Sequence, residues 1–266
     1  MKKPIVVIPA VINHAIGNKY GGWGWMEYSK KAWKYWCDKN GYELVIYDKC
    51  KIDDLVKYRV TVQRWFDIHE FLEEKGVEYS KVLMVDACSI PHWDCPDFFK
   101  LTGDNMCGMN DLDNLGWVHQ SVEGYKHMFD NFNFDITKYM NSGWVIFNES
   151  HKKLFKQFEK YYLDNFEEFY KLQTKTVKRG TCQTPLNYFI QMNNIKVDFL
   201  PQTFRLSHLH RREALRHNWQ MDGTEYEDKT LWFLKYGYIW VFSGFGKEHR
   251  NQLMEQTWNI IGHMYE

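Results

Sequence analysis

Residues 81–89 read KVLMVDACS, and the apolar run in this stretch ends directly at Asp86. A continuous apolar run of this length is typical of a strand that is buried on both faces, as in the parallel sheets of α/β proteins. Similar runs occur at residues 5–8 (IVVI) and 43–47 (ELVIY), and apolar residues at helical spacing separate the three runs. This alternation predicts an α/β protein with a mostly parallel sheet and helices on both of its faces.

The pattern in the rest of the sequence indicates further helices and strands, and also irregular segments. Two stretches without clear periodicity, about 101–135 and about 201–235, are expected to be irregular insertions. No repeat, low-complexity tract or linker divides the 266 residues, so we expect a single domain. The spacing of apolar residues indicates a strand at 144–147 and helices at 150–172, 184–192 and 248–265.

The composition excludes several classes of protein. The 34 Lys and Arg residues balance the 34 Asp and Glu residues, which rules out a strongly basic wrapper of nucleic acid and an acidic tail. Apolar residues at 44% and charged residues at 26% are typical of a globular chain. No apolar run approaches the ~18 residues of a membrane span, so no transmembrane segment is expected. The six cysteines show no CxxC pair or zinc-like spacing, and we expect reduced thiols and a cytoplasmic protein.

Asp86 is the first candidate site residue. In open α/β sheets, ligands bind beyond the carboxyl ends of the strands, and Asp86 stands at such an end. A carboxylate directly after a buried strand is costly unless a metal, a sugar hydroxyl or a backbone turn uses it. The residue pattern alone leaves both a functional site and a turn-capping Asp open.

Four segments resemble motifs of the nucleotide-sugar glycosyltransferases that have the GT-A fold. Residues 82–86, followed by PDFF at 96–99, look like the region around the D-x-D motif of these enzymes. Residues 139–148 (YMNSGWVIFN) are similar to the N-S-G strand of the glycogenin-like retaining enzymes. Residues 182–187 (CQTPLN) resemble their D-Q-x-x-L-N helix start, and 242–247 (FSGFGK) resemble their H-x-x-G-x-x-K motif. The resemblance implies a Rossmann-like GT-A sheet in one domain.

The resemblance also implies an activity and a role for each matched residue. It implies transfer of a hexose or pentose from a UDP-linked donor to an acceptor hydroxyl, with retention of the sugar's configuration. Residues 1–100 would form about the nucleotide-binding half, and 101–266 the sugar and acceptor half. The implied residues are Asp86 and Gln183 for catalysis; Asn141, Ser142, Gly143, Gly244, Lys247 and Arg59 for donor binding; and Cys182, Arg205, Arg211 and Arg212 on the acceptor side.

The family's metal site is incomplete in this sequence. The family usually holds Mn²⁺ or Mg²⁺ with the two acids of D-x-D and a C-terminal His, and the cation neutralises the departing diphosphate. Here Cys88 stands at the second acid and Val241 at the His, so Asp86 is the one matched ligand. A thiolate is a poor partner for these hard cations. Three explanations stay open: Lys247 and nearby arginines neutralise the diphosphate without a metal, other groups hold the metal, or the chain binds the donor without catalysis.

Other residues give weaker signals. Residues 111–113 (DLD) are a second D-x-D-like triplet, and Arg64 in the second expected helix is placed near the donor phosphates by the resemblance. The basic stretch 205–217 (RLSHLHRREALRH) is either a solvated face or a contact to phosphate groups. The phosphate groups that this stretch would contact belong to the donor, to a phosphorylated acceptor, or to DNA whose modified base receives the sugar. A Gly-rich loop with Trp23 and Trp25 follows the first strand after a gap; in the resembling enzymes the end of that strand helps to hold the nucleotide base, and the loop also suits an acceptor-side lid.

Three other classes of protein compete with a glycosyltransferase. A non-catalytic nucleotide-sugar or glycan-binding module on the same fold would explain Cys88 and Val241. A sugar nucleotidyltransferase would need a Gly-rich loop with an Arg tightly after the first strand, where this chain has Trp23 and Trp25 instead. A plain NAD-binding protein would need a G-x-G-x-x-G after the first strand, and the sequence has none there.

Overall fold

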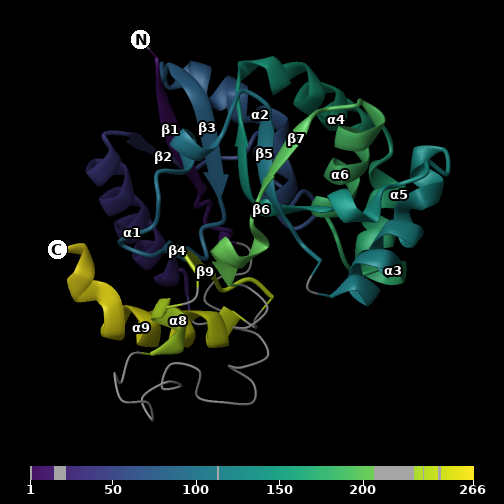
Figure 1. Cartoon of the computed structure of the whole chain (residues 1–266). Coiled ribbons are helices and arrows are strands. Elements are labelled where there is room, and N and C mark those ends of the chain that lie inside the picture. The colour runs from purple at the N-terminus through teal and green to yellow at the C-terminus, as the bar shows by residue number, and fades with distance from the viewer. Residues whose placement is uncertain (1, 15–21, 113, 207–230, 236, 245–246) are drawn as a thin grey trace.

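The computed structural model describes residues 2–14, 22–112, 114–206, 231–235, 237–244 and 247–266. Within these residues, a central six-stranded sheet has the order β2-β1-β3-β6-β5-β7 (Figure 1). Five of its strands run in one direction, whereas β6 runs antiparallel to its neighbours β3 and β5. The strands are β1 (Lys3–Pro9), β2 (Glu43–Tyr47), β3 (Tyr79–Val85), β5 (Met106–Asn110), β6 (Met140–Phe147) and β7 (Val197–Leu200).

Helices cover both faces of this sheet, as the sequence predicts. Ile5 and Val7 of β1 pack into one core with α2, α4 and α6, while Val6 and Ile8 pack into a second core with α1 and α9. Alternate residues of the buried strands thus serve two cores, which explains their continuous apolar runs. The described helices are α1 (Trp25–Asn40), α2 (Val60–Glu74), α3 (Leu115–Tyr125), α4 (Lys152–Asp164), α5 (Phe166–Lys171), α6 (Gln183–Met192), α8 (Trp232–Lys235) and α9 (Lys247–Ile261).

A small second sheet lies beside the carboxyl end of β3. In the described residues it has the order β4-β9-β8, with β4 antiparallel and β8 parallel to β9. Its strands are β4 (Ser89–Pro91), β8 (Arg205–Leu206) and β9 (Ile239–Val241). The pairing brings the residues after Asp86 next to the residues that precede α9.

Two expectations about the elements are wrong. The expected long helix at 150–172 is interrupted, because α4 ends at Asp164 and α5 begins at Phe166. Asn165 separates them, and its side chain donates to the carbonyl oxygen of Tyr161 at 2.9 Å, a local bond that competes with regular helix. The expected irregular insertion at about 101–135 contains β5 and α3, so it contributes a central strand to the sheet.

One edge of the sheet collects the segments that matter for function. β1 and β3 are parallel, so their carboxyl ends meet there, and the start of the antiparallel β6 arrives at the same place. Val85 pairs with Trp144, and the backbone N–H of Asp86 donates to the carbonyl oxygen of Gly143 at 2.9 Å. In the described part of the chain, every helix is too short or too polar to span a bilayer.

Candidate functional site

Asp86 follows β3, and its carboxylate lies against Arg64 of α2. Arg64 Nη1 donates to Asp86 Oδ1 at 2.6 Å, and Arg64 Nη2 donates to the carbonyl oxygen of Ser142 at 2.7 Å. The side chain of Arg64 is 3% exposed and that of Asp86 is 21% exposed. Burial lowers the pKa of Arg64, but the Asp86 carboxylate raises this pKa above its ordinary value, so the guanidinium stays charged. The ion pair thus holds the partly exposed Asp86 carboxylate in a fixed position.

Gly143 lets Asp86 approach β6. The Gly143 backbone N–H donates to Asn141 Oδ1 at 2.7 Å, and its carbonyl oxygen accepts from Asp86. A Cβ atom at this position would lie 2.3 Å from Asp86 Oδ2 and 3.0 Å from Asn141 Oδ1. Any larger residue at position 143 would therefore overlap Asp86, which explains sterically why the N-S-G segment has a glycine there.

Gln183, in the first turn of α6, joins β6 to Asp111. Its Oε1 accepts from the backbone N–H of Ser142 at 3.1 Å and from Asn141 Nδ2 at 3.2 Å. Its Nε2 donates to Asp111 Oδ2 at 2.8 Å, and Asn141 Nδ2 donates to the same oxygen at 2.9 Å. Three residues that the resemblance singles out thus share one buried network with Asp111.

Asp111 enters this network in a way that the sequence did not predict. Its pattern indicated one acid of a second D-x-D-like triplet, whereas in the structure it accepts hydrogen bonds from Asn141 and Gln183. The triplet's other acid, Asp113, lies outside the described residues. Cys182, expected on the acceptor side, is the N-cap of α6, and its Sγ lies 3.6 Å from Ser142 Oγ.

A cavity of about 570 Å³ opens beside Asp86. Val11 and Asn13 after β1, Trp25 of α1 and Arg59 before α2 line it together with Asp86. Its volume and mixed apolar and polar walls suit a nucleotide-sized ligand. A second groove of about 670 Å³ lies between α1 and the C-terminal residues, but it holds no residue of the four motif segments. We therefore take the cavity at Asp86 as the candidate site.

The residues at the family's metal position do not fit Mn²⁺ or Mg²⁺. Cys88 and Val241 are both buried in the apolar core on the α1 side, and the Cys88 carbonyl oxygen accepts from Phe242 N–H at 2.8 Å. Asp86 supplies a carboxylate, but one of its oxygens is bound to Arg64. Hard divalent cations need several oxygen ligands. Among the described residues, no three His, Cys, Asp or Glu side chains are grouped as a metal site would require.

The remaining expected residues fall into two groups. Arg59 lines the cavity, and Gly244 adopts φ +81°, a left-handed conformation that glycine favours, in the turn between β9 and α9. Lys247 is the first residue of α9, and Arg205 is the first residue of β8. Arg211 and Arg212, with the rest of the basic stretch beyond Leu206, lie outside the described residues.

Arg250 is a cavity residue that the sequence interpretation missed. Its Nε donates to the carbonyl oxygen of Phe242 at 2.9 Å, and its guanidinium carbon lies 4.9 Å from the ring centre of Trp25. These two contacts hold the side chain between the end of β9 and the start of α1, at the wall of the cavity. The available signal was its place one helical turn after Lys247 in an expected helix.

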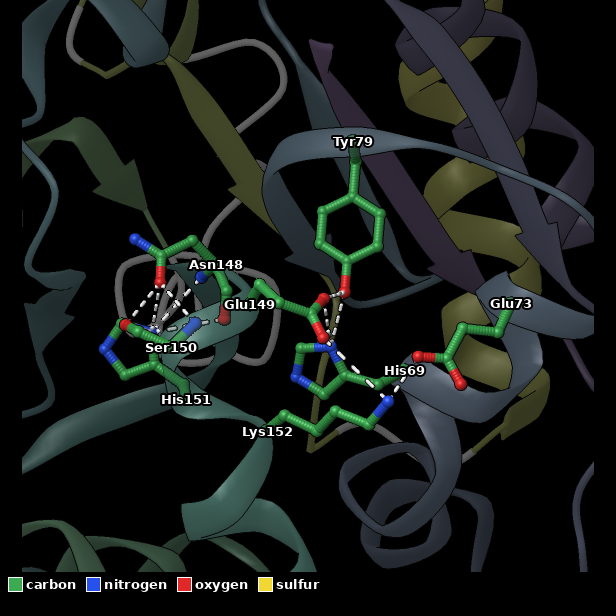
Figure 2. A network of polar contacts seen from close by, with 8 residues as sticks. All are labelled: His69, Glu73, Tyr79, Asn148, Glu149, Ser150, His151 and Lys152. Carbon is green, nitrogen blue, oxygen red and sulfur yellow. Dashed lines mark hydrogen bonds and ion pairs between the residues drawn. The ribbon is translucent and has the colours of Figure 1, made fainter.

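A second polar network, with buried His69 and Tyr79 and exposed acids around them, lies at the opposite end of β3 (Figure 2). Tyr79, the first residue of β3, donates to Glu149 Oε2 at 2.6 Å, and its hydroxyl lies 2.5 Å from His69 Nδ1. Lys152 forms ion pairs with Glu73 and Glu149 at the rim of this network. Burial lowers the pKa of His69 to about 4, so the imidazole is neutral at physiological pH.

Comparison with known proteins identifies the fold. No protein-family model and no curated protein sequence matches the chain. A glycosyltransferase involved in the glycosylation of the major capsid of PBCV-1 has a similar structure, with a TM-score of 0.51 at 9% identity over 95% of this chain and 100% of that one. The apo structure of the bifunctional glycosyltransferase WbbM gives a TM-score of 0.50 at 17% identity, over 99% of this chain and 51% of that one. The chain has the GT-A glycosyltransferase fold.

Proposed function

We propose that this chain is a glycosyltransferase that moves a sugar from a nucleotide-sugar donor to an acceptor hydroxyl. The observation that carries the proposal is the meeting of the motif segments around Asp86, which itself lines the cavity. Asp86 contacts Gly143 and Arg64, the N-S-G strand contacts Gln183, and the segment that ends β9 supplies Ser243 to the same cavity. The GT-A fold supports this reading. A UDP-linked donor and a retaining outcome follow from the motif resemblance and are part of the proposal.

The donor would lie with its nucleoside near the end of β1 and its sugar near Asp86. Val11 and the half-buried Trp23 offer apolar and aromatic surface for a base, while the partly exposed carboxylate of Asp86 can accept hydrogen bonds from hydroxyl groups. As the bond between sugar and diphosphate breaks, positive charge develops on the sugar ring. A carboxylate held in place by Arg64 can stabilise that charge without reorganising.

Gln183 would act by positioning. Both ends of its amide are engaged, one with the backbone of Ser142 and the other with Asp111. It thereby fixes the N-S-G strand against the start of α6, which sets the polar groups behind Asp86 in one geometry. The acceptor-side roles of Cys182, Arg205, Arg211 and Arg212 remain proposals, as does a nucleic-acid acceptor bound by the basic stretch.

The test is release of nucleoside diphosphate from UDP-glucose, UDP-galactose, UDP-N-acetylglucosamine and UDP-xylose, measured by chromatography with and without candidate sugar acceptors. Asp86→Asn should lower the release rate by about 100-fold or more, because a preorganised charge next to the reacting atoms is lost. Asp104→Asn is the matched control, since its carboxylate is 98% exposed. Near-ultraviolet circular dichroism reports whether each variant is folded.

Each outcome has a distinct meaning. Full activity in a folded Asp86→Asn protein would remove Asp86 from the site. Donor binding without turnover by any acceptor would favour the non-catalytic binding module, which Cys88 and Val241 in the apolar core would then explain. Absence of binding by all four donors would count against a UDP-sugar transferase.

A further inference from the structure

Positive charge from the protein surrounds the candidate cavity. Of the described residues that line it, three are arginines (Arg59, Arg64 and Arg250), and Asp86 is the one carboxylate. Arg64 and Asp86 neutralise each other, so Arg59 and Arg250 leave an excess of positive charge. The electrostatics of the cavity thus favour an anion.

Two helix N-termini add to this charge. Trp25 and Met26 are the first residues of α1, Val60 and Thr61 are the first residues of α2, and all four line the cavity. Among the described residues, no side chain caps the first turn of either helix. Each helix N-terminus acts as roughly half a positive charge, which favours a phosphate group close to it. In α1 the backbone N–H of Met26 already donates to the carbonyl oxygen of Trp23 at 3.1 Å, so α1 acts mainly through this charge.

At the position where the resembling family binds Mn²⁺ or Mg²⁺, this chain offers poor ligands for these cations. Asp86 Oδ1 is bound to Arg64, Cys88 offers sulfur, and Val241 offers no donor atom. In contrast, the guanidinium of Arg250 is already held in place by Phe242 and by the ring of Trp25. Such a side chain loses little conformational freedom when it binds a phosphate.

We propose that Arg59, Arg250 and the N-terminal turns of α1 and α2 bind the diphosphate of the donor directly, and that donor binding needs no divalent cation. This inference rests on the proposed function, because it takes the cavity as the donor site. Arg250 binds as a preorganised group, whereas the exposed Arg59 becomes ordered when the donor enters. Arg64 keeps Asp86 in place and adds positive potential beneath the diphosphate.

The test is isothermal titration of the full chain with UDP, UMP and uridine in a buffer with EDTA, and then with MnCl₂ in place of EDTA. UDP should bind in EDTA, and Mn²⁺ should change its dissociation constant by less than about threefold, which is under 1 kcal/mol. Affinity should fall from UDP to UMP to uridine, because each phosphate adds contacts to cationic groups. GDP, ADP and CDP are titrated in the same two buffers, so that the nucleotide is identified by measurement.

Two variants locate the phosphate contacts. Arg250→Gln and Arg59→Gln should each weaken UDP binding by about tenfold or more, since a charge-assisted hydrogen bond is lost, and should leave uridine binding unchanged. Lys160→Gln is the control, because Lys160 is an exposed residue of α4 that pairs with Asp164. It removes one positive charge elsewhere on the molecule and should leave UDP binding as it is.

The outcomes separate this inference from the proposed function. Binding of a nucleoside diphosphate only when Mn²⁺ is present would overturn the inference and keep the donor site. Equal losses of UDP and uridine affinity in Arg250→Gln would place Arg250 away from the phosphates and overturn its role. Failure of all four nucleoside diphosphates to bind in either buffer would overturn the donor site itself.

Discussion

Helix α2 contributes one buried side chain to each of two polar networks, which lie at the two ends of β3. At the cavity end, Arg64 is charged and holds the carboxylate of Asp86 at 2.6 Å. At the other end, His69 meets Tyr79 and Glu149, and burial keeps its imidazole neutral (Figure 2). Both side chains are almost fully buried, so a difference in burial does not explain why one is charged and the other neutral.

The difference lies in what each network faces. Asp86 gives Arg64 a close counter-charge and also lines the cavity, where a charge can act on a ligand. His69 Nε2 has no hydrogen-bond partner among the described residues and packs near Phe147 and Phe155. The same helix therefore keeps an ion pair where the cavity begins and a neutral side chain where the apolar core closes over it.

The largest effect is expected from breaking the charged network. Asp86→Ala should lower the free energy of unfolding by about 3–5 kcal/mol, because it leaves the guanidinium of Arg64 buried without its counter-charge. Urea unfolding measures the loss, and Arg64→Met combined with Asp86→Ala should recover part of it. A loss below about 1 kcal/mol would show that the pair contributes little.

The neutral network should respond to pH. Because the pKa of His69 falls from 6.5 in the unfolded chain to about 4 in the fold, its contribution is complete above about pH 6.5 and is lost as the pH falls toward 4. The loss amounts to about 3 kcal/mol. Asp67, whose pKa burial raises to about 6, opposes this trend in the same range.

The difference between the protein and its His69→Phe variant therefore isolates the histidine. Thermal or urea unfolding at a series of pH values gives the two stability curves, and their separation should change between pH 4 and 6.5. Parallel curves would mean that His69 titrates normally in the fold. The charges of Glu149, Glu73, Lys152 and His151 act on the His69 pKa, and these residues are the same in both proteins.

A smaller effect is expected from crowding the charged network. Gly143→Ala should cost about 1–3 kcal/mol of unfolding free energy, because its Cβ would overlap Asp86 Oδ2 inside a buried strand. It should also lower the release of UDP from a UDP-sugar, because it displaces the carboxylate that we place next to the sugar. Gly103→Ala is the matched control, since its nearest neighbour would lie 3.9 Å away. Equal stability of the two variants would mean that β6 can shift away from Asp86.

The smallest effect is expected from trimming the neutral network. Tyr79→Phe removes the hydroxyl that bonds Glu149 and contacts His69, and should cost about 1–2 kcal/mol while leaving UDP binding unchanged. The same titration and urea unfolding measure both quantities. A loss of UDP affinity in this variant would show that the two ends of β3 are energetically coupled, which would contradict the separation of the two networks.

The central strands could be predicted because each is buried on both faces. β1 and β3 leave continuous apolar runs, and the helices between them show regular spacing. The strands β4, β8 and β9 could not be predicted, since two or three residues carry no measurable periodicity. The break at Asn165 was equally hidden, because it depends on one side-chain bond within a long amphipathic pattern.

The motif segments of the site could be found in the sequence, but not how they connect. Asp86, Asn141 and Gln183 were singled out by resemblance, and the structure brings them to one edge of the sheet. The contacts of Asp111 with Gln183 and of Arg250 with Trp25 join residues far apart in the chain. Such contacts arise from tertiary packing, which single-sequence patterns do not encode.

The antiparallel β6 also has a consequence for how the chain folds. The segment from β1 to β3 can assemble by itself through two neighbouring strand–helix–strand units, whereas β6 must insert between β3 and β5 from a distant part of the chain. Asp86 meets Gly143 only when that insertion occurs. During synthesis, we expect the segment from β1 to β3 to collapse early and the contact between Asp86 and Gly143 to form last, so that ligand binding at the cavity would report completed folding.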